Sequence, residues 1–307
     1  MSRLFPLLVA ALAIAFGGPQ AAAGTVKRDE SFASKALGHV LHYAIYLPDG
    51  LDAAAPVPVI YLLHGADGHA IDWIDQGHVA QAADTLIAQH KLPRVIIVVP
   101  EAENSWYVDS PPSGMGAMGT AISEDLPNWI EQHYPVLTGR HGRAIAGNSM
   151  GGFGALRFAL AEPQRWAAAA SLSGALWNWL TPDTVIDPAH QAKLHQIFEG
   201  AFGDPFDPKR LIAASPLTMA AHMPKGAPPP PVLLICGRRD DFHLDRQQPV
   251  VEAALRADHI PVESVMTDGG HDWDTWSAQL PQVLEFLGRH LGRTAVATDA
   301  RTRPAVP

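Results

Sequence analysis

The stretch IAGNSMGGFGALRFAL, residues 145–160, constrains the fold of this chain more than any other feature of its sequence. An apolar run leads into it, four glycines surround a single serine, and an apolar helical pattern follows. Glycine is unfavourable inside regular structure and is used where φ must be positive or where backbones approach closely. Residues 147–151, GNSMG, fit G-x-S-x-G, which between a strand and a helix holds the serine on a sharp, strained turn. The pattern therefore predicts Ser149 as a nucleophile whose hydroxyl projects above a sheet.

The rest of the chain alternates between strand and helix patterns, which is typical of a doubly wound α/β domain. Continuous apolar runs, as expected for parallel strands covered on both faces, occupy 57–65, 94–102, 143–149, 167–174 and 231–237. Helical patterns occupy 79–90, 121–134, 154–163, 248–259 and 279–291. The run at 41–48 alternates apolar and polar residues, which predicts a half-exposed antiparallel edge strand. We therefore expect one mostly parallel sheet with helices on both faces.

The two ends of the chain differ from this pattern. Residues 1–23 combine Arg3, an apolar run over 4–16 and the small residues 21–23, the layout of a secretory signal peptide. The run is shorter than the roughly 20 residues that span a bilayer, so we expect cleavage near Ala23 and no stable membrane insertion afterwards. The predicted domain covers 24–292, and the tail 293–307 is predicted to be flexible. The mature protein is expected to be exported, to the periplasm or beyond the cell.

Composition excludes several classes of function. The net charge is -9 and no run of Lys or Arg is visible, which argues against a nucleic-acid partner. Cys236 is the only cysteine, so no intramolecular disulfide can form, and its apolar surroundings predict a buried core residue rather than a nucleophile. The sequence leaves the oligomeric state open.

A serine nucleophile needs a general base, and that base must be held in one tautomer by an acid. In folds with this nucleophile turn the partners follow in the order serine, acid, histidine. Asp240 and Asp241 follow the apolar run at 231–237, and His271 comes after a further strand-like run. We predict His271 as the base and Asp240 as the acid because Asp240 is first after the strand, with Asp241 as the alternative. His243 is too close in sequence to the acid to be the base.

Backbone amides are expected to stabilise the oxyanion that forms during attack. One is the N–H of Met150, at the start of the helix that follows Ser149. The second is expected from the loop after an early strand, where HGADG at 64–68 assigns it to the Ala66 N–H. His64, Asp67 and His69 could be read as metal ligands, but the oxyanion turn explains this stretch better. We predict neither a metal nor another cofactor.

Two loop regions interrupt the alternation of strands and helices. Residues 101–117 have loop composition and contain two aromatic residues, and residues 175–215 form a long insertion that contains Trp177 and Trp179. Long loops inside compact domains are often lids or binding elements. Simple packing by these tryptophans is an equal alternative.

Several motifs together resemble the esterase D-like family of α/β hydrolases. They are AIAGNSMGGFGALRFAL, YLLHG, SWYVDSP, CGRRDDF and GGHDWDTW, and the resemblance spans roughly residues 35–292. This family includes S-formylglutathione hydrolases, feruloyl and acetyl-carbohydrate esterases, tributyrin-type esterases, siderophore trilactone esterases and mycolyltransferases.

The resemblance implies an α/β-hydrolase fold and places the functional residues of the family on this chain. Its nucleophile falls on Ser149, its histidine on His271 and its oxyanion residue on Ala66. Its acid falls on Asp240, in the Asp-x-Phe pattern of 240–242. SWYVDSP matches a segment beside the active site of relatives, which implies that Trp106 and Tyr107 line the acyl or alcohol pocket. The remaining aromatic candidates for a substrate platform are Trp177, Trp179, Trp273 and Trp276.

The predicted function is an exported serine carboxylesterase that hydrolyses a small-molecule or carbohydrate ester through a Ser-His-Asp triad and an acyl-enzyme. One alternative is an acyltransferase of the mycolyltransferase type, which shares the acyl-enzyme. Another is a thioesterase similar to S-formylglutathione hydrolase, although that group is generally cytosolic. A catalytically silent binding protein on the same scaffold is the alternative from a different class.

Overall fold

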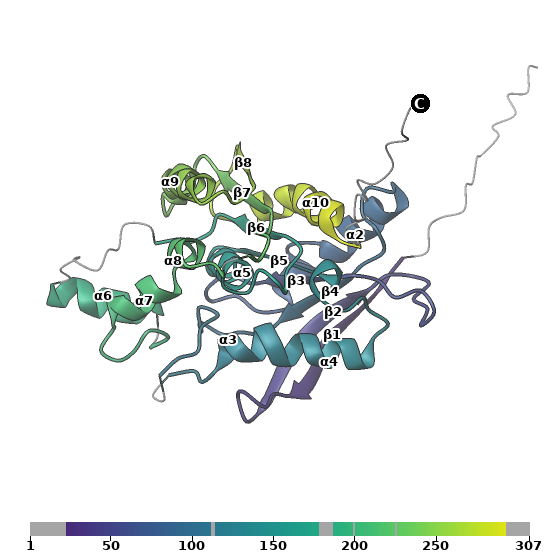
Figure 1. Ribbon diagram of the computed structural model, residues 1–307, viewed down its shortest axis with the longest axis horizontal. Helices are drawn as coiled ribbons and strands as arrows, with labels where there is room; N and C mark the ends of the chain where they lie inside the picture. The colour runs from purple at the N-terminus through teal and green to yellow at the C-terminus, as the bar shows by residue number, and fades with distance from the viewer. Residues whose placement is uncertain (1–22, 112–113, 178–186, 199, 225, 293–307) are drawn as a thin grey trace, which may run out of the picture.

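The computed structural model describes residues 23–292, apart from 112–113, 178–186, 199 and 225 (Figure 1). The predicted tail, Trp179 and all but the last residue of the predicted signal peptide lie outside the described residues. Within the described part of the chain, no helix combines the length and the apolar composition that crossing a bilayer requires.

One eight-stranded sheet with the order β1-β2-β4-β3-β5-β6-β7-β8 forms the centre of the molecule. The strands are β1 Thr25–Ala33, β2 Val40–Leu47, β3 Val59–Leu63, β4 Ile96–Pro100, β5 Arg143–Asn148, β6 Ala169–Leu172, β7 Val232–Gly237 and β8 Val262–Thr267. β1 and β2 run antiparallel to their neighbours, whereas β3 to β8 are mutually parallel. The carboxyl ends of the six parallel strands therefore meet at one edge of the sheet, where ligands bind in open α/β sheets.

The antiparallel direction predicted for the strand at 41–48 is confirmed, but its predicted position at the edge is wrong. β1 pairs outside β2, from Thr25 opposite Leu47 to Ala33 opposite Val40. The β1 sequence TVKRDESFA has little apolar periodicity, and most of its side chains are exposed. β1 pairs with β2 through backbone hydrogen bonds, which a pattern of apolar side chains does not predict.

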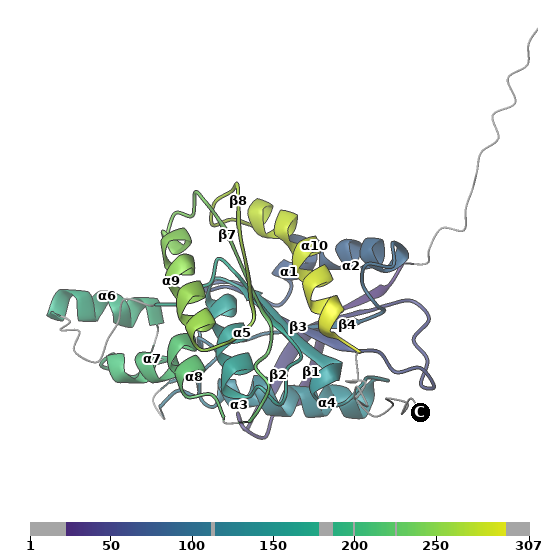
Figure 2. The same ribbon diagram turned by 45° about the horizontal axis from the view of Figure 1, so that its top comes forward.

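Helices cover both faces of the sheet, as predicted (Figures 1 and 2). The helical segments are α1 Asp72–Asp75, α2 Val79–Ala88, α3 Met118–Thr120, the π-helix η1 Ala121–Asp125, α4 Leu126–His133, the 3-10 helix η2 Arg140–Gly142, α5 Met150–Ala161, α6 Pro188–Phe198, α7 Pro208–Ala214, α8 Pro216–Ala221, α9 Leu244–Ala257 and α10 Trp273–His290. The apolar cluster on one face takes side chains from α4, α5, α7, α8 and α9. The cluster on the other face takes them from α1, α2 and α10. Alternate residues of the buried strands contribute to the two clusters, which explains their continuous apolar runs.

The insertion predicted at 175–215 is partly helical. Figure 2 shows α6 and α7 to one side of the sheet, beyond α8 and away from α10. Phe198 of α6 packs edge-on against Trp106, with ring centroids 4.8 Å apart, and also contacts Trp177 at 5.1 Å. These contacts favour the packing interpretation for Trp177.

Candidate active site

Ser149 occupies a strained turn between β5 and α5. Its backbone has φ 53° and ψ -116°, a conformation that L-residues rarely adopt. The adjoining glycines allow this turn to pack closely. A Cβ on Gly147 would lie 2.5 Å from the Gly151 carbonyl, and one on Gly151 would lie 2.4 Å from the carbonyl oxygen of Leu63. Only glycine fits at these two positions, so the glycine pattern of the sequence has a steric cause.

Three side chains that are far apart in sequence meet in one hydrogen-bonded series. Ser149 lies just after β5, Asp240 after β7 and His271 after β8, all at the carboxyl edge of the sheet. His271 Nδ1 lies 2.8 Å from Asp240 Oδ2, and its Nε2 lies 3.0 Å from Ser149 Oγ. An ionised carboxylate can only accept, so Nδ1–H donates to Asp240. With Nδ1 as the donor, Nε2 is the ring nitrogen that faces the Ser149 hydroxyl.

Asp240 is held in its ionised form. Its side chain is 0% exposed, and Oδ1 accepts from the backbone N–H groups of Phe242 and Leu244 at 3.0 and 3.3 Å. Burial raises the pKa of this carboxyl, but the hydrogen bond and charge of His271 and these two N–H groups lower it further. The net pKa is below the usual aspartate value, so the group is an anion that can stabilise a protonated His271.

The structure also locates the alternatives that the sequence left open. Asp241 and His243 are both exposed, and His243 has a φ of 57° at the start of α9. Only Asp240 of the two neighbouring carboxylates contacts His271. Asp272, beside the histidine, caps α10 by accepting from the Thr275 N–H at 2.8 Å.

The two predicted oxyanion donors flank Ser149. The loop after β3 passes so close that a Cβ on Gly65 would lie 3.4 Å from the Ser149 Cβ. Ala66, the next residue, is exposed, and Met150 begins α5. Among the described residues, neither the Ala66 nor the Met150 N–H donates a hydrogen bond to the backbone. The N-terminal end of α5 adds a positive dipole beside Ser149.

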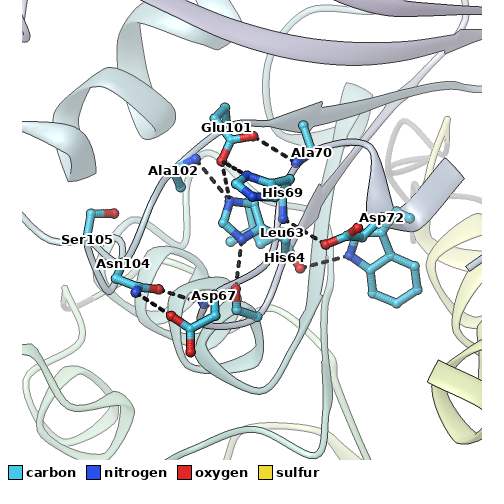
Figure 3. A network of polar contacts seen from close by, with 12 residues as sticks. Leu63, His64, Asp67, His69, Ala70, Asp72, Glu101, Ala102, Asn104 and Ser105 are labelled. Carbon is cyan, nitrogen blue, oxygen red and sulfur yellow. Dashed lines mark hydrogen bonds and ion pairs between the residues drawn. The ribbon is translucent and has the colours of Figure 1, made fainter. Parts of the chain in front are cut away.

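A polar network beneath this loop, absent from the sequence prediction, is shown in Figure 3. His64 is 0% exposed, its Nδ1–H donates to the Gly65 carbonyl at 2.8 Å, and its Nε2 accepts the Ala102 N–H at 3.0 Å. Both ring nitrogens of His64 are thus occupied by backbone groups. Among the described residues, no three His, Cys, Asp or Glu side chains are placed to hold a metal ion.

Glu101 continues this network toward the start of α1. It accepts the Ala70 N–H at 3.1 Å and lies 3.4 Å from His64 Nε2 and 3.5 Å from His69 Nδ1. Burial raises the pKa of Glu101, but the hydrogen bond from the Ala70 N–H and the neighbouring His69 lower it, so the net pKa is below the usual glutamate value. The carboxylate therefore ties the loop after β3 to the loop after β4.

Asn104 forms a second tie to the same loop. Its Oδ1 accepts the Asp67 N–H and its Nδ2 donates to the Asp67 carboxylate, both at 2.8 Å (Figure 3). Asp67 has a φ of 56°, which an isolated loop would adopt only rarely. This pair holds the peptide next to the Ala66 amide. The signal in the sequence was positional: Glu101 and Asn104 follow β4, at the same edge of the sheet as Ser149.

Trp106 and Tyr107, which were expected to line the acyl or alcohol pocket, are both buried. Tyr107 is 0% exposed, and its hydroxyl donates to the His64 carbonyl at 2.8 Å. Trp106 is 3% exposed, and its Nε1–H donates to the Ile197 carbonyl at 3.3 Å. Both residues have positive φ, 53° and 55°, which turns the loop inward. They support the site from within the core.

The aromatic residues that do surround His271 come from two other segments. Trp276 and Phe242 contact its ring edge-on, with centroids 4.9 and 4.7 Å away. Trp273 is partly exposed and packs edge-on against Trp73 and Trp276 at 5.0 and 5.2 Å. Phe242 was not among the predicted aromatic contacts of a substrate.

A serine, a histidine and a buried carboxylate joined in this order, at the carboxyl edge of this sheet, define a serine hydrolase of the α/β-hydrolase fold. The Esterase family model, described as "Putative esterase", matches residues 34–201, and the chain belongs to that family. The matched range includes Ser149 and Ala66.

Individual relatives are similar over different lengths. An acetyl esterase from Caldicellulosiruptor saccharolyticus is 26% identical over 234 residues, which cover 75% of this chain and 83% of that protein. Esterase Rv1288 from Mycobacterium tuberculosis is 31% identical over 152 residues, 47% of this chain and only 31% of that longer protein. A solved ferulic acid esterase matches with a TM-score of 0.72 at 27% identity, over 88% of this chain and 99% of its own. The chain is a carboxylester hydrolase, and the predicted fold and family resemblance are confirmed.

Proposed function

We propose that this chain is an exported carboxylesterase in which Ser149 forms an acyl-enzyme, His271 is the general base and acid, and Asp240 orients His271. The observation that carries the proposal is the unbroken series of contacts, 3.0 Å from Ser149 to His271 and 2.8 Å from His271 to Asp240. Roles in this chemistry require hydrogen-bond reach first, and both contacts are within it.

Acylation follows from this geometry. As Ser149 Oγ bonds to the ester carbonyl carbon, its proton passes to His271 Nε2, and Asp240 stabilises the resulting imidazolium. The carbonyl oxygen gains negative charge and accepts hydrogen bonds from the Ala66 and Met150 N–H groups. When the tetrahedral intermediate collapses, His271 returns the proton to the alcohol oxygen, and the alcohol leaves.

Deacylation uses the same groups in the same order. A water molecule takes the place of the alcohol and gives a proton to His271 Nε2 as its oxygen bonds to the acyl carbon. The Ser149–acyl bond then breaks, the proton returns to Ser149 Oγ, and the free acid leaves. Asp240 remains ionised throughout, consistent with its lowered pKa.

The substrates to try first are esters of acetate and ferulate, because the similar proteins are an acetyl esterase and a ferulic acid esterase. Export is proposed from the first 23 residues of the sequence. The N-terminal residue of protein recovered outside the cytoplasm tests it: a start near Gly24 supports cleavage, whereas an intact Met1 contradicts it.

The proposed triad is tested with two matched pairs of variants, Asp240→Asn with Asp241→Asn and His271→Ala with His243→Ala. Asp240 and Asp241 are adjacent and both histidines follow parallel strands of the sheet, but only the first member of each pair contacts its proposed partner. Asp240→Asn and His271→Ala should each lower kcat on 4-nitrophenyl acetate by about 10⁴-fold, while Asp241→Asn and His243→Ala change it less than about twofold.

Ser149→Ala should lose turnover and also covalent labelling by a fluorophosphonate, with little change in its thermal unfolding. Full labelling of the Ser149→Ala variant would show that another residue is the nucleophile. Equal losses within a matched pair would show that the loop as a whole, rather than the named side chain, supports activity.

A further inference from the structure

Phe242 is an apolar side chain left open to solvent beside the proposed active site. It is 68% exposed, more than the other large exposed hydrophobic side chains of the described residues, Val40 at 48% and Val250 at 53%. It lies between β7 and α9, two positions after Asp240. An exposed aromatic ring loses the favourable free energy of burial, so its position at a site calls for a reason.

The place of Phe242 is fixed by the same groups that fix the histidine. Its backbone N–H donates to Asp240 Oδ1 at 3.0 Å, while Asp240 Oδ2 receives His271. Its ring lies 4.7 Å from the His271 ring, at an interplanar angle of 73°. Trp276, the second aromatic neighbour of His271, is only 6% exposed. Of these two rings, Phe242 alone offers apolar surface to a ligand.

The chemistry decides which part of an ester this surface would meet. In the proposed mechanism His271 Nε2 gives its proton to the departing alcohol, so that oxygen must lie within about 3 Å of Nε2. The carbonyl oxygen instead points to the Ala66 and Met150 amides. The carbons next to the alcohol oxygen therefore lie beside the His271 ring, close to the exposed ring of Phe242.

We propose that Phe242 forms the alcohol-side subsite, a platform on which a ring of the leaving alcohol packs. The chemical class is an ester whose alcohol carries a ring with an apolar face, either the C–H face of a pyranose or an aryl group. A short linear alcohol offers too little surface to use the platform. This inference rests on the proposed function, because the side of the ester is assigned through the proton that His271 returns.

The test keeps the acyl group constant and varies the alcohol. Phenyl acetate, an acetylated methyl xylopyranoside and ethyl acetate all give the same acetyl-enzyme and differ only in the leaving group. Phe242→Ala should lower kcat/KM for one or both ring-bearing esters by about three- to tenfold and for ethyl acetate by less than about twofold. The ester for which kcat/KM falls identifies the ring of the alcohol as aryl, sugar or both. Phe242→Trp, which keeps an aromatic face, should retain the wild-type kcat/KM for the same esters.

Deacylation distinguishes this role from a structural one. The rate at which the acetyl-enzyme hydrolyses, measured after a burst with 4-nitrophenyl acetate, should be the same in wild type and Phe242→Ala because the alcohol has already left. Val250→Ala, an exposed apolar residue of α9, is the matched control and should change neither rate.

Three results would overturn the proposal. Equal losses on all three acetates would show that Phe242 acts only by positioning His271. A loss that follows the acyl group, seen with methyl acetate against methyl ferulate, would place the ring on the acyl side. No change with any ester would remove it from the site. Failure of the proposed function is separate, because the wild type itself would then show no acetyl-enzyme burst.

Discussion

Ser149→Gly, which removes the Cβ at this position, should be more stable than Ser149→Ala, which keeps it. The φ of 53° and ψ of -116° at this position place a side chain in a sparsely populated region, which costs about 1–3 kcal/mol. Both Ser149→Gly and Ser149→Ala lose the 3.0 Å hydrogen bond to His271, so that term cancels between them. The comparison therefore leaves two backbone effects, the strain and the conformational freedom of glycine.

The expected difference follows from two opposing effects. Glycine relieves the strain of about 1–3 kcal/mol. It also loses more conformational freedom on folding, which costs about 0.5–1 kcal/mol. Ser149→Gly should therefore be more stable than Ser149→Ala by about 1 kcal/mol. For a domain of this size such a difference raises Tm by about 2 °C.

The assay is urea unfolding followed by circular dichroism, with thermal unfolding as a second readout. Ser123, a buried residue of the helical segment η1 that does not have positive φ, is the control position. There the glycine variant should be less stable than the alanine variant by about 0.5–1 kcal/mol, the opposite sign. If glycine were also the less stable substitution at position 149, the turn would hold no strain and the reasoning would be wrong.

Four further outcomes are expected. Gly151→Ala should lower the free energy of unfolding in urea by about 2–3 kcal/mol, because its Cβ would lie 2.4 Å from the Leu63 carbonyl oxygen. Asn104→Ala should lower kcat by about tenfold with Tm nearly unchanged, because it releases the loop that carries the proposed oxyanion donor Ala66; an unchanged kcat would contradict this. Cys236 should resist Ellman's reagent in the native protein and react in urea, since burial raises the pKa of this thiol to about 12. Asp240→Asn should cost more stability near about pH 7 than near about pH 3, measured by urea unfolding. Its lowered pKa stabilises the fold above the ordinary aspartate range, and that contribution is lost as pH falls through the folded value.

The chain order of Ser149, Asp240 and His271 could be predicted because each follows an apolar strand. Parallel strands bring their carboxyl ends to one edge, so residues far apart in sequence become neighbours once the strands are identified. The choice between Asp240 and Asp241 could not be derived in this way. It depends on which carboxylate the turn after β7 directs inward. That turn is fixed by hydrogen bonds from the Phe242 and Leu244 N–H groups to Asp240, and a pattern of apolar residues does not reveal such bonds.

The residues after β4 show the limit of motif reasoning more clearly. A tryptophan and a tyrosine in a loop near an active site look like substrate contacts, yet Tyr107 is fully buried and bonds to the His64 carbonyl. Positive φ at Trp106 and Tyr107 turns both side chains inward, and sequence periodicity does not report φ at non-glycine residues. The outward-facing aromatic ring, Phe242, looked ordinary because its role depends on exposure, which only the fold determines.

Two different kinds of interaction hold the segments around Ser149. Ser149 is held by steric packing, because glycines let β5, α5 and the end of β3 approach one another. The loop after β3 is held by polar contacts instead, from Glu101, Asn104 and Tyr107. Steric packing tolerates no larger residue, whereas a polar tie can be weakened without unfolding the chain. Substitutions of Glu101 and Asn104 should therefore reduce turnover before they reduce stability, while those at the glycines should do the reverse.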